Sequence, residues 1–291
     1  MVNNLSFRKI WSVCRTEYVK WIMNARMIMF AALIVFVYDY VIRTIMENGE
    51  KMGEPINIIE PFIAIGNSAL LLFIMPIVFL ALISDFPKSD GNSMFYMIRT
   101  GKVNWFLGQT LFAIVAGITY VGAIFGISCL VVMKNAFVYN EWSDVVYLYY
   151  KYFPNDSENV ILDLITDRLY NNLTPMQAFT HTALLMLLMV IMTALIQLLS
   201  FAYNRKMVGL LINICLLCMG IGTTLFEGSL KWAFPVSNAV AWMHYDRVFK
   251  KPIVPIVNSY LYFIIINFVL LVWNIIAIKR YDFSKVRDLE D

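Results

Sequence analysis

Few residues in this chain of 291 are of a type that carries out chemistry. His181 and His244 are its two histidines, and a long stretch of sequence separates them. Cys215 and Cys218 have the spacing of a zinc or redox pair, but leucine and isoleucine surround them and no second pair of ligands lies nearby. We interpret them as small apolar helix residues. No metalloprotease, serine-hydrolase or phosphate-loop motif occurs, so we expect no catalytic, metal or cofactor-binding residue, and no enzyme activity, in this chain.

Charged side chains inside apolar segments are the next candidates, because such groups are costly in a membrane and are often functional. Asp39 and Arg43 are four residues apart, so they can pair on one face of a helix. This candidate intramembrane ion pair is either a boundary salt bridge, which we favour, or part of a substrate site. No apolar segment carries an acid at mid-depth of the kind that ion-coupled carriers use, so any energy for transport must come from elsewhere.

One polar loop, residues 85–104, has the pattern of a short helix between two apolar segments. Pro87 disfavours helix just before it, and Gly101 suits a helix C-terminus, so we predict a helix over Asp90–Thr100. An apolar helix in a polar loop is suited to docking into a groove on another protein, and the alternative is that it rests on the membrane surface. Its apolar and terminal basic residues are Met94, Phe95, Met97, Ile98, Arg99 and Lys102.

The composition requires a membrane around these residues. Hydrophobic residues make up 60% of the chain and charged residues 15%, and the mean hydropathy is +0.68. A soluble domain has far more charge and no interior for so much apolar surface. The net charge of +3 indicates no particular partner, and a nucleic-acid-binding function is excluded. The chain is therefore predicted to be an all-α integral membrane protein.

Six apolar stretches are long enough to cross a bilayer core as helices, within a single transmembrane domain of residues 1–291. Pro76 is expected to kink the second one. The predicted spans are 27–45, 61–84, 105–133, 179–203, 208–225 and 256–278.

Lysine and arginine near the span ends set the orientation. With both termini in the cytoplasm, 14 of the 23 basic residues lie on the inner side and nine on the outer side, where many acids dilute them. We therefore expect cytoplasmic segments at 85–104 and 279–291 and an extracytoplasmic segment at 134–178. Residues 1–26 contain aromatics at helical spacing with five bases, which predicts a cytoplasmic interfacial helix. The alternative for this helix is an inward extension of the first span.

This arrangement resembles the membrane-spanning permease subunit of bacterial type-2 ATP-binding-cassette (ABC) exporters. The resemblance covers the whole length, with an N-terminal amphipathic helix, six spans and both ends inside. Its most specific part is the 85–104 loop, with Asp90-Gly91 and Ile98-Arg99-Thr100-Gly101-Lys102, followed by Trp105 and Gly108. In such a permease the loop is similar to the coupling helix that docks on the ATPase. Segment 226–255, with Pro235 and Trp242, is similar to the extracytoplasmic re-entrant helices between the last two spans.

The resemblance implies partners that this chain lacks. A separate cytoplasmic ABC ATPase would bind ATP and magnesium, and a second permease subunit, identical or not, would complete the pathway in the cytoplasmic membrane of a bacterium. Met94, Phe95, Ile98 and Arg99 would contact the ATPase. The exported substrate would be a hydrophobic or amphipathic peptide, drug or lipid. The competing hypothesis is a non-transporting membrane sensor, or an immunity protein that binds a peptide at its outer face.

Overall fold

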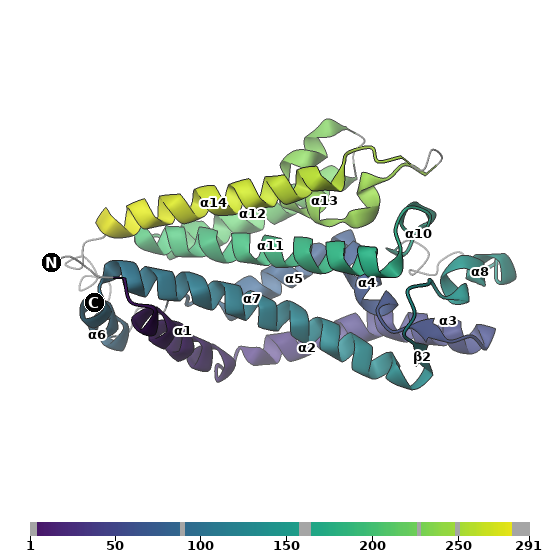
Figure 1. The fold of residues 1–291 in the computed structure, drawn as a ribbon, viewed down its shortest axis with the longest axis horizontal. Helices are drawn as coiled ribbons and strands as arrows, with labels where there is room; N and C mark the ends of the chain where they lie inside the picture. Colours follow the sequence, from purple (N-terminus) through teal and green to yellow (C-terminus); the bar gives the residue numbers. More distant parts are fainter. Residues whose placement is uncertain (1–4, 88–90, 157–163, 226–227, 248–250, 281–291) are drawn as a thin grey trace.

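The computed structural model describes residues 5–87, 91–156, 164–225, 228–247 and 251–280, and for 91–95 it describes the backbone only. Both ends of the described chain lie at one end of the bundle, which we call the terminal end, on the left in Figure 1; the opposite end is the distal end. The α-helices are α1 (Phe7–Ile22), α2 (Met27–Val37), α3 (Arg43–Met52), α4 (Glu60–Asn67), α5 (Ala69–Leu82), α6 (Gly91–Thr100), α7 (Lys102–Val132), α8 (Asp144–Tyr152), α10 (Asp167–Tyr170), α11 (Pro175–Ala202), α12 (Lys206–Thr224), α13 (Pro235–Ala239) and α14 (Ile256–Arg280). A π-helical turn (Tyr38–Ile42), three 3₁₀ turns, η2 (Met133–Asn135), η3 (Ser229–Ala233) and η4 (Ala241–His244), and the strands β1 (Ile56–Asn57) and β2 (Ala136–Phe137) complete the described elements.

The long helices confirm an all-α membrane protein. Among the described residues, five helices are long and apolar enough to cross a bilayer, and the bent pair α4–α5 makes a sixth span if it is counted as one. Almost three quarters (72%) of the most apolar stretch of α11 is buried, against a third or less in the other four. Helix α11 contacts α4, α5, α7, α12 and α14, so it forms the centre of the bundle.

The first span is longer than its apolar residues predict. Helix α2, the π-helical turn and α3 form one helix from Met27 to Met52, whereas the predicted span ended at residue 45. The added part, α3, buries Ile45, Asn48 and Gly49 on one face and exposes Glu47 and Glu50. An amphipathic helix such as α3 packs its apolar face against another element of the protein. Here that element is α8, at the distal end.

The second span is broken, and the break is not where the proline is. Helices α4 and α5 meet at Ser68 with a bend of 86°, while Pro76 lies in the interior of α5. The expectation of a kink at Pro76 therefore misplaced the main bend. Ser68 has an extended backbone and its side-chain oxygen accepts the Leu71 N–H (3.2 Å), which is the geometry of a helix N-cap.

Helix α1 packs lengthwise on α7. The Ser6 N–H donates to Asn104 Oδ1 (3.1 Å) near the start of both helices, and the Tyr18 hydroxyl lies 3.0 Å from the Thr119 hydroxyl further along. The two helices therefore run side by side in the same direction, as Figure 1 shows. Gly108 permits the close approach, because a Cβ there would lie 2.6 Å from Val13 Cβ. This path fits the alternative reading of residues 1–26, an inward extension of the first span, while the exposed Phe7 and Trp11 are features of an interfacial helix.

A small folded unit, the distal unit, caps the far end of the bundle. It consists of α3, β1, β2, α8 and α10, which come from both sides of α7 in the sequence. Strands β1 and β2 are parallel, with Ile56 opposite Ala136 and Asn57 opposite Phe137. The extracytoplasmic segment predicted at 134–178 is thus largely structured in its described part.

The chain between α12 and α14 also folds back on the bundle. All five residues of α13 are buried, and this helix contacts α5, α11, α12 and α14. The described part of 226–255 is therefore a packed hairpin and not a free loop.

Candidate functional site

The predicted helix in the 85–104 loop exists as α6, at the terminal end of the bundle, where both ends of the described chain also lie (Figure 1). Its last turns have two faces. Met97 is 4% exposed and packs in the core, whereas Ile98 is 67% exposed and Arg99 is also exposed. The side chains of Met94 and Phe95, and the start of the predicted helix at Asp90, lie outside the described residues. An exposed isoleucine beside an exposed arginine is the kind of surface that a protein partner buries.

Helix α6 is firmly joined to the bundle at its C-terminal end. Within α6 the Thr100 hydroxyl donates to Tyr96 O (2.6 Å), and Asn104 Nδ2 of α7 donates to Thr100 O (2.9 Å), which joins the two helices. Since Asn104 Oδ1 also accepts the Ser6 N–H, this buried amide links α6, α7 and the start of α1. Gly101, between α6 and α7, has φ of +86°, which favours glycine and allows the sharp turn. A force on α6 would therefore reach α1 and α7 directly.

The segment before α6 has its own anchors on three other helices. Arg26, at the start of α2, pairs with Asp85 (2.6 Å), and Lys206 Nζ, at the start of α12, donates to Pro87 O (2.7 Å). The ring of Phe86, which is 6% exposed, lies 5.1 Å from the ring of Phe112 on α7. These contacts tie the loop to the starts of the first and fifth spans and to the interior of the third.

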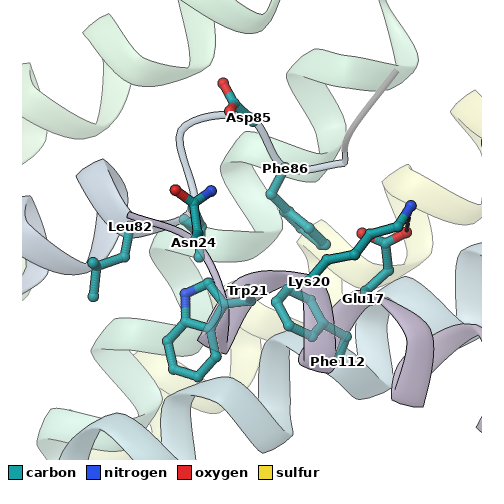
Figure 2. A pocket seen from close by; sticks show the side chains of 9 residues that line it. Glu17, Lys20, Trp21, Asn24, Leu82, Asp85, Phe86 and Phe112 are labelled. Atoms are coloured by element: carbon teal, nitrogen blue, oxygen red, sulfur yellow. Dashed lines mark ion pairs between the residues drawn. The ribbon is translucent and has the colours of Figure 1, made fainter. Parts of the chain in front are cut away.

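A cavity of about 50 Å³ lies in this junction, between the end of α1 and the end of α5 (Figure 2). It combines charged groups with aromatic walls. Glu17 and Lys20 are 3.9 Å apart, and the buried Trp21 indole Nε1 has no hydrogen-bond partner. The residues that line it are Glu17, Lys20, Trp21, Asn24, Leu82, Ile83, Asp85, Phe86 and Phe112.

The predicted pair of Asp39 and Arg43 forms, with 3.1 Å between Oδ1 and Nη1. Arg43 also pairs with Glu47 (2.8 Å), one turn further on, and all three side chains are at least half exposed. Two acids on one base, on an exposed helix face, contribute little to stability. The pair lies in the first-span helix, remote in the fold from α6, so the two groups of predicted site residues do not form one site.

Glu60 organises the distal unit, a role that the sequence did not reveal. Its carboxylate is 1% exposed and accepts three hydrogen bonds: from the Asn57 N–H (3.0 Å), the Ser143 N–H (2.7 Å) and the Ser143 hydroxyl (2.8 Å). Ser143 is the N-cap of α8, and Glu60 is in the first turn of α4, so the carboxylate lies at two helix N-termini where negative charge is favoured.

Two cavities open on the distal unit. One, of about 570 Å³, lies between α3 and the end of α7 and includes Glu50, Glu54 and Lys134. The other, of about 530 Å³, is lined by Tyr147 and Tyr170, whose rings meet edge to face at 4.8 Å. Burial is the main cause that raises the pKa of both tyrosines.

A buried polar cluster holds the hairpin after α12 against the broken second span. Asn67 Oδ1 accepts the Ala241 N–H (3.1 Å), and the Trp242 indole donates to Asn67 O (3.0 Å). Next to it, the Ser259 hydroxyl lies 2.7 Å from Asn238 Oδ1 and 3.2 Å from His244 Nε2. The sequence signal for this cluster was only the presence of polar residues in apolar segments.

The remaining candidates stay apart. His181 Nδ1 lies 2.8 Å from the Tyr260 hydroxyl, and His244 belongs to the cluster with Ser259, so each histidine has a neutral partner. Cys215 and Cys218 are exposed, unpaired thiols on α12. Within the described residues no three His, Cys, Asp or Glu side chains gather in a way that could hold a metal ion.

Comparison of the chain with protein-family models, with curated proteins and with solved structures finds no match.

Proposed function

We propose that this chain is the permease subunit of an ATP-driven ABC exporter in the cytoplasmic membrane of a bacterium. It moves a hydrophobic or amphipathic substrate, and a separate cytoplasmic ATPase supplies the energy. The observation that supports this most is α6: a helix at the terminal end with Ile98 and Arg99 exposed, joined through Asn104 to α1 and α7.

The proposal places the terminal end in the cytoplasm, because the predicted inner side holds most of the basic residues. The ATPase contact consists of Met94, Phe95, Ile98 and Arg99. Buried aromatic and aliphatic side chains dominate such interfaces, whereas an arginine at the rim contributes less. The Asp85–Arg26 and Pro87–Lys206 contacts then carry movement of α6 to the first and fifth spans. A second permease subunit, identical or not, completes the pathway.

The test is to purify the chain with the ATPase encoded beside its gene. Phe95→Ala should weaken binding of the ATPase by about 2 kcal/mol, as for a hot-spot residue, and Ile98→Ala by a smaller amount. Tyr203→Ala is the matched control, because Tyr203 is an exposed aromatic (55%) at the same end. Retained complex and transport-dependent ATP turnover are measured. Wild-type values for both Phe95→Ala and Ile98→Ala would refute the coupling role.

The alternative, a sensor or immunity protein that binds a peptide at its outer face, is favoured by the distal unit and its two cavities. In that case the chain alone, without an ATPase, would bind a peptide at this end. Failure to recover any ATPase complex, together with peptide binding that is lost on Tyr147→Ala, would favour this function over export.

A further inference from the structure

The cavity between α1 and α5 has a hydrogen-bond donor that nothing in the described fold uses. Trp21 is only 6% exposed, and its indole Nε1 is buried without a partner. In Figure 2 the indole nitrogen is on the side of the ring that faces Asn24 and Leu82. A buried N–H without a partner costs free energy, so this geometry suits a ligand that brings an acceptor.

Further donors stand beside the indole. Asn24 Oδ1 accepts the Arg26 N–H (3.0 Å), so the amide Nδ2 of Asn24 is its donating end. Lys20 lines the cavity, and the Arg26 guanidinium lies just outside, 2.6 Å from Asp85. An indole, an amide and two cations are together suited to a phosphate group.

The cavity is not simply cationic, because Glu17 and Asp85 also line it. Each acid lies near a base: Glu17 near Lys20 (3.9 Å), and Asp85 against Arg26 (2.6 Å). A ligand with only negative charge would be repelled by the two carboxylates. A zwitterion with one phosphate and one ammonium adds no net charge and can satisfy both kinds of group.

The surroundings are apolar in a way that fits an amphiphile. Val19, Ile22 and Met23, at the end of α1, are 48%, 43% and 80% exposed, and Ile28 at the start of α2 is 75% exposed. These side chains offer a surface for acyl chains next to a polar cavity. A volume of about 50 Å³, several times the minimum for one water, also favours a compact headgroup.

We propose that the cavity lined by Trp21, Asn24, Lys20 and Asp85 binds the phosphoethanolamine headgroup of a membrane phospholipid. The phosphate accepts from the Trp21 indole, the Asn24 amide and the Lys20 ammonium, while the lipid ammonium donates to Asp85 and Glu17. The headgroup thereby joins α1, α5 and the segment that leads to α6. This site is independent of the exporter proposal.

The test uses the full chain in detergent with short-chain phosphatidylethanolamine, phosphatidylglycerol or soluble glycerophosphoethanolamine, with native mass spectrometry as the readout. Phosphatidylethanolamine should bind at least about tenfold more tightly than phosphatidylglycerol. Trp21→Phe keeps an aromatic ring and removes the donor, so it should weaken phosphatidylethanolamine about tenfold, as for a hydrogen bond to a charged group. Trp11→Phe, on the same helix and 50% exposed, should have no effect.

A second variant separates loss of the site from loss of folding. Asp85→Asn removes the acceptor of the ammonium and releases Arg26, so it should weaken phosphatidylethanolamine and strengthen phosphatidylglycerol, a reversal that misfolding cannot produce. Equal binding of the two lipids to the wild type, or unchanged binding in Trp21→Phe, would overturn the proposal. Displacement of the lipid by an equal concentration of glycerophosphoethanolamine would show that the source is a soluble headgroup and overturn the lipid assignment.

Discussion

At the scale of single residues, buried polar groups at the ends of the spans determine how the loops are held. Glu60 has three neutral donors and two helix N-termini around it. The side-chain oxygen of Asn67 accepts hydrogen bonds from the backbone N–H groups of residues 241 and 242, and its backbone oxygen accepts one from the Trp242 indole. Removing a partner from such a group leaves others unsatisfied, which costs more than the net value of the bond.

In Glu60→Gln one carboxylate oxygen becomes an NH₂ group, which faces the N–H donors of Asn57 or Ser143. We expect the distal unit to be destabilised by about 1–3 kcal/mol, seen as a lower apparent melting temperature and faster tryptic cleavage at the exposed Lys151. Glu50→Gln, an exposed acid on α3, serves as the control. Equal cleavage rates in the two variants would show that Glu60 does not hold the unit.

At the scale of elements, small residues decide which helices can approach. Helix α7 contains Gly108, against Val13 and Ile10 of α1, and Gly122, which has no neighbouring atom within 4 Å of an added Cβ. The same residue type on one helix therefore has two different roles: close packing at Gly108 and only conformational freedom at Gly122.

This difference gives a matched pair of substitutions. Gly108→Ala should separate α1 from α7, because the new Cβ would lie 2.6 Å from Val13 Cβ and 2.9 Å from Ile10 O. Overpacking of this kind costs about 1–3 kcal/mol. Gly122→Ala should be neutral or stabilising by up to about 1 kcal/mol, because alanine favours helix. Thermal unfolding of both proteins in the same detergent measures the difference, and equal melting temperatures would contradict the packing of α1 on α7.

At the scale of the whole molecule, the elements divide between two ends. Helix α6 and both ends of the described chain lie at the terminal end, and the distal unit lies at the other (Figure 1). This separation agrees with the division of inner and outer loops that the basic residues predict. The orientation in the membrane can therefore be tested by labelling one residue at each end.

The topology prediction uses single cysteines in a cysteine-free background. Asn155→Cys at the distal end should react with a membrane-impermeant reagent added to intact cells, because Asn155 is exposed. Lys9→Cys, exposed at the terminal end, should react only after the membrane is opened. Labelling of position 9 in intact cells would place the terminal end outside and remove the cytoplasmic assignment of α6.

The sequence predicted six spans from apolar length, which is a local property, and the described residues contain five such helices, or six if the bent pair α4–α5 is counted as one span. It predicted α6 for the same reason, from Pro87 and Gly101. It missed the bend at Ser68, because the hydrogen bonds that hold the neighbouring Asn67, the last residue of α4, come from residues 241 and 242. It also missed the distal unit, whose key contact joins Glu60 to Ser143 across a whole span. Such contacts depend on the tertiary arrangement and leave no pattern within a short window.

The unbroken helix from Met27 to Met52 has a mechanical consequence. Its 26 residues form a rod about 39 Å long at 1.5 Å per residue. One end begins beside the Arg26–Asp85 pair, and the other carries the face that packs on α8. For a lever of that length, a tilt of about 10° about one end moves the other by about 7 Å. The π-helical turn at Tyr38–Ile42 is the point along the lever where such a tilt can be absorbed by bending.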